Sequence, residues 1–451
     1  MALSWDPAPL RVQSAADPAG PRHRAPAAGE PVARLLAGPR AAAGPESLAA
    51  HQQRLGPLEL RERTPAELRS LVAESGLTGR GGAGFPTVRK LRAVADRPGW
   101  ALVVVNGSES EPASRKDREL LTLRPHLVLD GAVVGAAAVG SDQVVIAVHG
   151  EASPWAQALE RALGERDRER HGSPSIRLAV VPPRYVAGES SSLVAFLEGG
   201  AAKPRPGRPA ATHGVDGRPT LVLNAETVAH LALIARRGAR WFREAGTPGA
   251  PGSHLMTLVG PHGAEVLELV RPQRLGDLLS DRGLGGRLPA AVLLGGYGGA
   301  WVDGAEAAEL PLGRDRLAER GLSFGCGLVG LLPAGRCGLA ETARLLAYLA
   351  GETAGQCGPC RFGLPALALA AADLARGRAT RREVGRLRRR AAAIAGRGAC
   401  HLPDGAVTLL DHALRVFADD VERHLRRGPC QDAGAPPTFP IPPPPGLPGW
   451  R

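Results

Sequence analysis

Residues 101–119, "ALVVVNGSESEPASRKDRE", join a short apolar run directly to a dense cluster of polar side chains. The apolar run is typical of a buried β-strand, because valine dominates it and no polar residue interrupts it. Asn106, Glu109, Glu111 and Lys116 follow within a few positions. Open α/β sheets bind ligands just beyond the carboxyl ends of parallel strands, so this cluster is a candidate site. A solvated run of self-paired charges is the alternative interpretation.

Three further apolar runs have the length and composition of strands, and helix-like stretches separate them. They are "QVVIAV" (143–148), "SIRLAVV" (175–181) and "TLVLN" (220–224). Apolar strands that alternate with helices predict a mainly parallel α/β sheet covered by helices. We expect this first domain to span residues 57–245.

The N-terminal residues 1–56 are rich in alanine, proline, glycine and arginine, and they show no helical or strand periodicity. This composition predicts a mobile arm. Ordered structure is expected to begin at Thr64, which is placed to form a capping box with Glu67 at the start of a helix.

The composition changes again after the first domain. Residues 246–330 hold short strand-like pieces and one helix-like piece, which fits a small α+β module. Residues 331–430 contain four helical patterns with short joints, which predicts a four-helix domain. Residues 431–451 are rich in proline and are expected to form an exposed, extended tail.

The chain carries a formal net charge of +12, and only three of its 56 basic residues are lysine: Lys90, Lys116 and Lys203. Such a strong arginine preference points to biased codon usage, so the basicity is weak support for nucleic-acid binding. A basic surface would still attract acidic proteins. A lysine that survives in this background indicates a need for a compact ammonium group.

Six cysteines in 451 residues do not form the framework of a secreted disulfide-rich domain. The first residues lack the features of a signal peptide, and no uncharged apolar run approaches the roughly 20 residues that a membrane span needs. We therefore expect a cytoplasmic protein without direct membrane insertion. Any link to a membrane would run through a partner protein.

The stretch "GLTGRGGAGFPTVRK" (76–90) is a glycine-rich loop with two basic residues, Arg80 and Lys90. Glycines expose backbone N–H groups and let a phosphate approach the main chain. The alternative is an ordinary surface turn, which is frequent in a chain with 59 glycines.

Two more stretches combine helix starts with polar groups. "RYVAGESSS" (184–192) is a capping sequence before an apolar helix, and a helix N-terminus also binds anions. "LVLNAET" (221–227) places Asn224, Glu226 and Thr227 after another strand. The helix cap is the simpler interpretation of the first stretch.

Cys357 and Cys360 form a C-x-x-C pair between two predicted helices, and Cys400 follows at another helix joint. A pair with this spacing can be a redox dithiol, half of a zinc site or half of an iron–sulfur site. Helix ends can converge in a bundle, so the three thiols could meet.

Taken in order, these motifs resemble the family of NADH-quinone oxidoreductase F subunits, the flavin-carrying and NADH-oxidising subunits of respiratory complex I, with relatives in hydrogenases and formate dehydrogenases. The resemblance runs from about residue 60 to 428 and rests on "GRGGAGFPT", "SEPASRKDRE", "YVAGES", "LEGGAAKPRP", "NAET", "CGPC" and "GACHLPDGA". It implies an FMN-binding α/β domain (57–245), a ubiquitin-like SLBB domain (246–330) and a four-helix iron–sulfur domain (331–430).

The resemblance also implies the residues of a flavin and nicotinamide site. Glu111 would be the catalytic residue beside the nicotinamide, and Phe85 would contact the nucleotide. Ser190 and Ala210 depart from the family pattern, which has a second glutamate and an aromatic ring there, so the preference between NADH and NADPH is expected to differ. The implied FMN contacts are Gly79, Arg80, Gly81, Gly82, Lys90, Asn106, Glu109, Tyr185, Glu189, Asn224 and Thr227.

For the cluster, the resemblance implies Cys357, Cys360 and Cys400 as ligands of a [4Fe–4S] cluster. Ala354 stands where the family has a further cysteine. Three cysteines can hold a [3Fe–4S] cluster or a [4Fe–4S] cluster with one labile iron, and a degenerate site without metal is the alternative. The candidates for a fourth ligand are His401, Cys326, Cys337, a water molecule or a partner's thiol.

The resemblance therefore implies an NADH dehydrogenase-like oxidoreductase. Electrons would pass from NAD(P)H through FMN and the cluster to a ferredoxin-like or quinone-reductase partner, with a membrane redox complex reached through partners. The helix Arg381–Arg390, which has six arginines, is a candidate docking surface for an acidic ferredoxin. The alternatives are a flavoprotein electron carrier that receives electrons from a partner instead of nicotinamide, and a non-catalytic scaffold. No nucleic-acid partner is expected.

Overall fold

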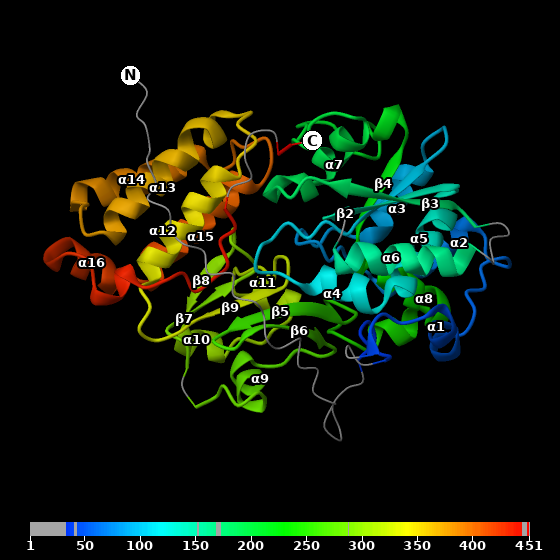
Figure 1. Ribbon diagram of the computed structural model, residues 1–451, viewed down its shortest axis with the longest axis horizontal. Coiled ribbons are helices and arrows are strands. Elements are labelled where there is room, and N and C mark those ends of the chain that lie inside the picture. Colours follow the sequence, from blue (N-terminus) through cyan, green and yellow to red (C-terminus); the bar gives the residue numbers. More distant parts are fainter. Residues whose placement is uncertain are drawn as a thin grey trace.

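The structure is a computed structural model, and helices and strands follow one another along most of the chain (Figure 1). It describes residues 33–39, 43–150, 153–167, 173–286, 288–443 and 449–450.

A four-stranded parallel sheet forms the centre of the N-terminal half, as the strand pattern predicts. Its strand order is β3-β2-β1-β4, and every neighbouring pair is parallel. The register pairs Asn106 with Asn224, so the carboxyl ends of β1 and β4 lie side by side. The strands are β1 (Leu102–Asn106), β2 (Gln143–His149), β3 (Ser175–Val181) and β4 (Thr220–Asn224).

Helices cover both faces of this sheet, because alternate strand residues are apolar on each side. Val103 and Val105 pack against the larger helical layer, whereas Leu102 and Val104 pack against α7 (Figure 1). Within the larger layer, α5 and α8 approach so closely that a Cβ atom on Gly131 would lie 1.8 Å from the Val228 carbonyl oxygen. The helices of this half are α2 (Pro65–Ser75), α3 (Thr87–Ala95), α4 (Lys116–Leu123), α5 (Pro125–Val139), α6 (Pro154–Arg166), α7 (Ser190–Leu197) and α8 (Ala225–Arg243).

Ordered structure begins well before Thr64, so the expected mobile arm is wrong for the part that the structure describes. Leu35 is fully buried, and the Glu268 carboxylate accepts hydrogen bonds from the backbone N–H groups of residues 34–36. Helix α1 (Leu48–Leu55) follows, and its His51 donates from Nε2 to the buried Asp130 Oδ2 at 2.6 Å. Buried ionic partners hold a segment whose composition alone indicated disorder. Residues 1–32 of the expected arm lie outside the described residues.

A second, mixed sheet follows, with the order β6-β5-β9-β7-β8. Its central pair, β5 and β9, is parallel, and the other pairs are antiparallel. Leucines of α9 pack on one face of this sheet. The expected α+β composition is present, with two more strands than the sequence pattern predicts. The elements are β5 (His254–Gly260), β6 (Gly263–Leu269), α9 (Leu275–Asp281), β7 (Ala291–Leu294), β8 (Ala300–Asp303), α10 (Gly304–Ala308), α11 (Arg314–Ala318) and β9 (Leu328–Leu332).

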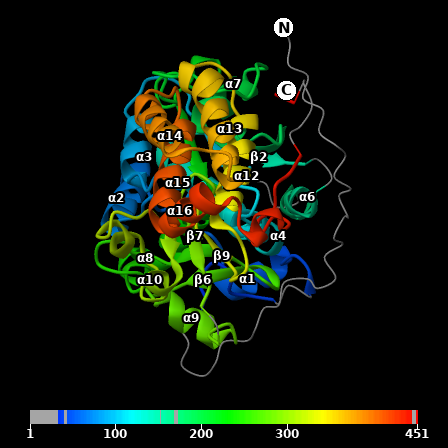
Figure 2. The ribbon, with the colours of Figure 1, turned by 90° about the vertical axis from the view of Figure 1, so that its left-hand side faces the viewer.

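The C-terminal part is helical, and Figure 2 shows its helices gathered on one side of the molecule. The last predicted helix is broken at Phe417, so the described part contains five α-helices instead of the expected four. The buried Phe417 ring sits against Gly338 and Trp301, and the chain turns there before continuing. The helices are α12 (Gly338–Gly351), α13 (Leu364–Ala375), α14 (Arg381–Ile394), α15 (Leu402–Val416) and α16 (Ala418–Arg427), with a π-helical turn at Pro359–Gly363.

The described part of the proline-rich tail is exposed only in part, because some of its side chains pack against the protein. Phe439 is 1% exposed, and its N–H donates to Glu341 Oε1 at 3.0 Å. Further along, the Trp450 ring lies under the Arg184 guanidinium at 4.3 Å and near the Lys203 ammonium at 5.1 Å. Apolar and cation–π contacts therefore hold the tail across the molecule.

No single helix among the described residues is long and apolar enough to cross a membrane. Helices α4 and α5 meet the length and composition criteria only when taken together, and they are bent by 98° at their junction.

Candidate functional site

The candidate site is built at the carboxyl ends of β1 and β4, where the parallel register brings two asparagines together. The Asn106 side chain donates to the Gly188 carbonyl oxygen at 2.7 Å and so ties β1 to the start of α7. Asn224 caps α8, and its amide donates to Asp117 Oδ2 at 2.7 Å. Polar groups from distant sequence stretches thus meet at one sheet edge, which is where such sheets bind ligands.

The glycine-rich loop lies over this edge. The Arg80 N–H donates to Thr227 Oγ1 at 2.8 Å, which fixes the loop to the first turn of α8. A Cβ atom on Gly81 would lie 3.3 Å from Asn224 Cβ, so only glycine fits comfortably. Gly79, Gly82, Asn224 and Thr227, which the sequence patterns single out separately, therefore belong to one neighbourhood.

One buried and two partly buried cationic side chains, Arg80, Lys90 and Arg314, lie beside the loop. Arg80 is 1% exposed, its Nη2 donates to the Pro251 carbonyl at 2.8 Å, and its Nε has no partner among the described residues. Burial and nearby Arg314 lower the pKa of Arg80 to about 9. Lys90 Nζ donates to the Val222 carbonyl at 3.2 Å, and burial lowers the pKa of Lys90 while Glu189 opposes this. Cations that have no carboxylate ion-pair partner among the described residues, beside a glycine loop, suit an anionic phosphate. These residues therefore fit FMN.

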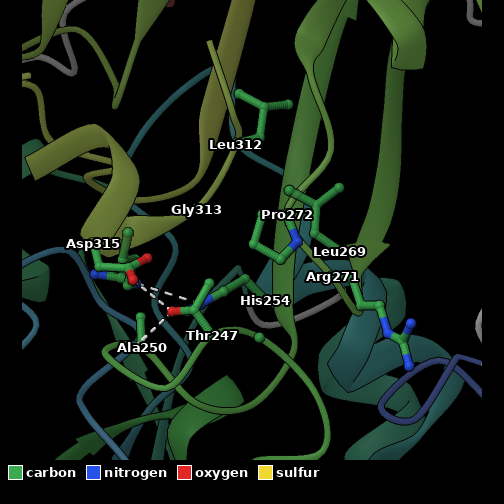
Figure 3. A pocket seen from close by; sticks show the side chains of 11 residues that line it. Thr247, Ala250, His254, Leu269, Arg271, Pro272, Leu312, Gly313 and Asp315 are labelled. Atoms are coloured by element: carbon green, nitrogen blue, oxygen red, sulfur yellow. Dashed lines mark hydrogen bonds between the residues drawn. The ribbon is translucent and has the colours of Figure 1, made fainter. Parts of the chain in front are cut away.

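Arg314 is a part of this site that the sequence patterns did not indicate. It lies at the start of α11 and reaches toward the Gly82 carbonyl, which is 3.5 Å from its Nη1. Arg314 helps to line the small hollow in Figure 3, where Thr247 donates to Asp315 at 2.6 Å and anchors the helix start. This hollow has a volume of about 10 Å³, which can hold at most one water molecule, so it is not a cofactor pocket.

Glu109 and Lys116 have structural partners. The Glu109 carboxylate accepts the N–H groups of Asp117 and Arg118 at 3.3 and 3.2 Å, which caps the start of α4. The Lys116 ammonium donates to Asp117 at 2.8 Å and to Glu226 at 2.9 Å. Burial lowers the pKa of Lys116, but the two carboxylates outweigh it and raise the pKa overall. The compact ammonium serves a buried ion pair here.

Glu111 is held differently, because one of its two carboxylate oxygens has no hydrogen-bond partner among the described residues. Its Oε2 accepts from the Tyr185 hydroxyl and from the Tyr297 N–H, both at 3.0 Å, whereas its buried Oε1 has no partner among the described residues. Burial raises the pKa of Glu111 to about 7, although both hydrogen bonds oppose the shift. Such a carboxyl can hold or release a proton near neutral pH, as acid–base chemistry requires.

An aromatic group surrounds Glu111 and links three parts of the molecule. The chain has only three tyrosines, and all lie here: the Tyr348 ring meets Tyr185 at 6.0 Å and Tyr297 at 5.8 Å, edge to face. Tyr185 follows β3, Tyr297 follows β7 and Tyr348 is on α12. Their packing fixes Tyr185, which in turn orients Glu111.

Cys326 lies in the same neighbourhood, because a Cβ atom on Gly296 would come within 2.7 Å of Glu111 Oε2 and 3.1 Å of Cys326 Sγ. Gly296 has a φ of +118°, which glycine alone adopts readily. Sequence reasoning placed neither Tyr297 nor Tyr348 here. The scarcity of tyrosine was a signal of the same kind as the scarcity of lysine.

Glu189 lies between the glycine loop and the cysteine loops. It caps α7 by accepting the N–H groups of Ser191 and Ser192 at 2.9 and 3.0 Å. Its charge opposes the lowering of the Lys90 pKa, and it adds to the raised pKa of Cys400, which burial mainly causes. The predicted flavin and cluster regions are therefore neighbours. Phe85, predicted to contact nucleotide, is 42% exposed and lies under the Arg89 guanidinium.

The three predicted cluster cysteines come together from two loops. Burial and neighbouring Cys357 raise the pKa of Cys360 to about 12, and Cys400 adds to this. Burial alone would raise the pKa of Cys357, but the N–H groups of Ala399 and Cys360 outweigh it and lower the pKa. Cys360 lies on the π-helical turn, a distortion that is frequent at functional sites. The three thiols thus lie close enough to influence one another's pKa, which is compatible with a cluster held by three protein ligands.

Two of the predicted fourth ligands are engaged elsewhere. Cys337 is at the start of α12, beside His424 and Cys430, whereas Cys357 follows the far end of this helix, which is about 21 Å long. The Cys326 thiol donates to the Gly295 carbonyl at 3.4 Å, beside Glu111. The third, His401, has a fully exposed side chain 3.6 Å from Asp404. Neither cysteine takes the place that Ala354 leaves open.

Comparison with known proteins agrees with both halves of this arrangement. Residues 72–233 match the Nuo51 FMN-binding domain, and residues 340–424 match the NADH-ubiquinone oxidoreductase-F iron-sulfur binding region. The NADH-quinone oxidoreductase F subunit 2 of Rhizobium meliloti is 30% identical over 394 residues, covering 82% of this chain and 91% of that protein. The corresponding F subunit of Streptomyces coelicolor is 30% identical over 381 residues, covering 81% and 84%.

The chain belongs to the family of NADH-quinone oxidoreductase F subunits. As a member of this family it is a flavin and iron–sulfur electron-transfer oxidoreductase, and the resemblance inferred from the motifs is confirmed.

Two solved structures of an NAD+-reducing [NiFe]-hydrogenase are similar in fold and 28% identical in sequence. The H2-reduced form has a TM-score of 0.72 and the air-oxidized form 0.74, over 81% and 88% of this chain. This NADH-quinone oxidoreductase family member spans 63% and 69% of the length of those two hydrogenase chains. The mixed α/β architecture with its parallel sheet is therefore shared.

Proposed function

We propose that this protein passes electrons from NAD(P)H through FMN and an iron–sulfur cluster to an acidic iron–sulfur partner. When bound, FMN accepts two electrons as a hydride and releases them singly. The proposal rests mainly on Glu111 at the sheet edge. Its buried Oε1 has no partner among the described residues, and its pKa of about 7 lets the carboxyl exchange a proton near neutral pH. We assign the flavin to residues 57–245, a ubiquitin-like SLBB domain to 246–330 and the cluster to 331–430.

In this proposal the glycine loop and its cations bind the phosphate end of FMN. Lys90 and Arg80 would turn their charged groups to the phosphate, and Arg314 would hold the loop through Gly82. Glu111, which accepts hydrogen bonds from Tyr185 and Tyr297, would exchange a proton with the nucleotide bound at this site. Asn106, Asn224 and Thr227 keep the loop and the strand ends in place, so they shape the pocket.

Electrons would leave through the cysteine loops. Cys357, Cys360 and Cys400 would hold an iron–sulfur cluster, and Glu189 lies between these loops and Lys90. Proximity of the two regions is what single-electron transfer needs. Six free cysteines are consistent with a reducing cytoplasm, where we place this reaction.

The partner would dock on the C-terminal helices. Arginines of α14 line a groove against α13 together with Leu369, which is 60% exposed, and Phe362 nearby is 69% exposed. An apolar centre surrounded by positive charge suits an acidic ferredoxin-like protein, because opposite charges speed and orient the encounter. The Nuo51 and iron–sulfur matches support assembly with such iron–sulfur proteins, and any membrane complex would be reached through them.

The proposal is tested on anaerobically purified, full-length protein with FMN added. We expect NADH or NADPH to reduce ferricyanide in the wild type, and Lys90→Gln to lose at least about tenfold in FMN affinity, since a charge-assisted bond to phosphate is worth about 1.5–3 kcal/mol. Arg92→Gln, an exposed change on the same helix, is the control and should bind FMN normally. Wild-type protein that binds no FMN would refute the proposal.

A second candidate is an electron carrier without nicotinamide, and the position of Trp450 favours it. The ring lies on Arg184 and Lys203, which belong to the stretches "RYVAGES" and "LEGGAAKPRP". A tail held there would restrict access for a nucleotide. Trp450→Ala distinguishes the two: nicotinamide activity that appears only in this variant supports the carrier, whereas equal activity in both proteins supports the dehydrogenase.

A further inference from the structure

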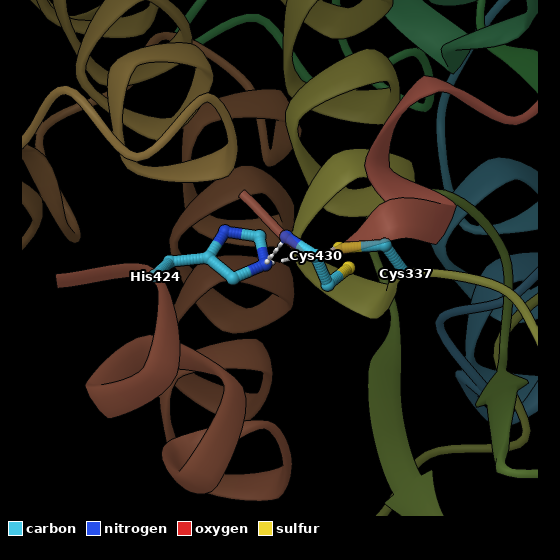
Figure 4. Close-up of side chains that lie close together, drawn as sticks. All are labelled: Cys337, His424 and Cys430. Atoms are coloured by element: carbon cyan, nitrogen blue, oxygen red, sulfur yellow. Dashed lines mark hydrogen bonds between the residues drawn. The ribbon is translucent and has the colours of Figure 1, made fainter. Parts of the chain in front are cut away.

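Cys337, His424 and Cys430 converge outside the site described above (Figure 4). Their ligand atoms all lie within 4.8 Å of one another, and Cys337 Sγ is 3.8 Å from His424 Nε2. Cys337 precedes α12, His424 is near the end of α16 and Cys430 opens the segment that follows. Three separate parts of the chain thus place two thiols and one imidazole around a common point.

Hydrogen bonding fixes the tautomer of His424. Its Nδ1 lies 3.2 Å from the Leu374 carbonyl oxygen, and because a carbonyl only accepts, Nδ1 carries the proton. Nε2 therefore presents a lone pair, and it accepts the Cys430 N–H at 3.2 Å. The Cys337 thiol lies 3.8 Å from the same nitrogen, so Nε2 would be available to a metal ion once the Cys430 N–H releases it. This is the arrangement of a metal-binding histidine, whose far nitrogen is oriented by a backbone carbonyl.

Burial raises the pKa of Cys337 to about 12, and the Ala340 N–H opposes this shift, so a metal ion would have to displace the thiol proton on binding. The Cys337 Sγ accepts the Ala340 N–H at 3.4 Å and so caps α12, where the helix dipole stabilises negative charge. Cys337 and His424 are 4% and 1% exposed, and Cys430 is partly exposed. The protein covers the Cys337 and His424 side chains, whereas the partly exposed Cys430 leaves a path by which an ion can enter.

This cluster is separate from the iron–sulfur site. Cys337 and Cys430 fall outside residues 340–424, the region that matches the family's iron–sulfur segment. Helix α12, which is about 21 Å long, lies between Cys337 and the Cys357 loop in the chain. The ligand atoms are also too close together to surround a multi-iron cluster, and they suit a single ion.

We propose that Cys337, His424 and Cys430 bind one zinc ion, with a water molecule as the fourth ligand. Two thiolates and a neutral imidazole form a soft donor set, which selects zinc in a reduced protein. Zinc bonds of about 2.3 Å to sulfur and about 2.1 Å to nitrogen put ligand atoms about 3.6–3.8 Å apart, so the Cys337–His424 spacing already fits. Binding requires the Cys430 backbone to release Nε2.

The ion would serve as a cross-link. Cys430 leads into the segment that packs on α12, where Glu341 accepts the Thr438 and Phe439 N–H groups at 3.0 Å. Tyr297, whose backbone N–H donates to Glu111, donates its hydroxyl to the Pro440 carbonyl. Zinc would therefore tie α12, α16 and this tail segment together, and its binding energy would add to folding stability.

Metal analysis of the full-length protein tests the proposal. Purified under reducing, anaerobic conditions, the wild type should contain about one zinc ion per chain besides its iron. Cys430→Ser should lose most of the zinc and keep the iron, whereas Cys326→Ser, the matched control at a cysteine outside both metal sets, should keep both. Zinc retained at the wild-type level in Cys430→Ser would overturn the proposal, and so would iron in place of zinc.

A cobalt titration keeps the test independent of the variant's folding. Wild-type protein stripped of zinc by a chelator and then given Co²⁺ should develop thiolate-to-cobalt absorption and a higher Tm. Absence of that absorption would overturn the proposal. A Cys337–Cys430 disulfide in freshly prepared, zinc-free protein would also overturn it, because the pair would then be a redox couple.

Discussion

At the scale of single residues, the glutamate with one unpartnered oxygen distinguishes this site from an ordinary buried ion pair. Glu109 and Glu111 stand two positions apart, and both are buried. Backbone N–H groups occupy the Glu109 carboxylate, whereas Glu111 keeps Oε1 for a ligand. The sequence resemblance assigned Glu109 to FMN binding and Glu111 to the nicotinamide side, and it could not show which carboxylate has its hydrogen-bonding capacity already used.

Replacing Glu111 with glutamine should make stability less dependent on pH. Burial raises the pKa of Glu111 from 4.5 to about 7, so the folded state favours the protonated form. The stabilisation that the protonated Glu111 carboxyl gives to the folded state is full below pH 4.5 and is lost as the pH rises to about 7. The free energy of unfolding should differ by up to about 3 kcal/mol between these limits. Urea unfolding at pH 5 and pH 8 should show Glu111→Gln gaining stability relative to wild type at pH 8.

Glu160→Gln, at an exposed position on α6, is the control and should follow the wild type at both pH values. Equal pH dependence in wild type and Glu111→Gln would contradict the assignment of a raised pKa to this carboxyl.

Restoring a thiol at position 354 tests the cluster site. Ala354 lies three residues before Cys357, and neither Cys337 nor Cys326 replaces the missing ligand. If the site holds three irons, Ala354→Cys should raise bound iron from about three to about four per chain. If it holds four irons, one of them labile, the variant should bind that iron stably. In both cases the EPR signal should change. An unchanged iron content and EPR signal would mean that a fourth ligand is already present or that no cluster is held.

At the scale of elements, the strand predictions succeed because apolar runs are local properties of the sequence. The four strands of the first sheet and the capping box at Thr64 follow directly from the sequence. The break between α15 and α16 does not, because the helical periodicity continues through Phe417. Packing of that ring on Gly338 and Trp301, which come from elsewhere in the chain, sets the break.

The contact between α5 and α8 gives a prediction at this scale. Gly131→Ala would force a Cβ atom to 1.8 Å from the Val228 carbonyl oxygen, so the helices must separate. The overpacking cost of about 1–3 kcal/mol should exceed the helix-propensity gain of about 1 kcal/mol. Urea unfolding should therefore show a net loss of stability.

Gly164→Ala on α6 is the matched control, because its Cβ atom would meet nothing within 4 Å. This variant should gain up to about 1 kcal/mol. If Gly131→Ala gained as much, the close approach of the two helices would be refuted.

At the scale of the whole molecule, the site depends on contacts that the sequence order hides. Tyr185, Tyr297 and Tyr348 come from three separate parts of the chain, and the tail returns to Arg184 and Lys203. Motifs within single stretches were sufficient to predict the glycine loop and the cysteines. Arg314 and two of the tyrosines could not be predicted, because no local motif places them near Glu111.

Charge on α14 should control delivery of electrons to a partner. Replacing Arg386 and Arg390 with glutamate should slow transfer to an acidic ferredoxin about tenfold or more at low salt, with little change in ferricyanide reduction. Arg63→Glu, an exposed change outside the helical C-terminal part, is the control. Equal slowing with both acceptors, or no slowing with ferredoxin, would place the partner elsewhere.

The central claim is that nicotinamide electrons pass through a flavin to an iron–sulfur cluster within this chain. Rapid mixing of the anaerobic, FMN-loaded protein with NADH and, separately, NADPH tests it most directly through the visible spectrum. The account predicts that at least one nucleotide bleaches the flavin band first and the broad iron–sulfur absorption after it. A protein whose chromophores are bleached by dithionite and by neither nucleotide would contradict the account.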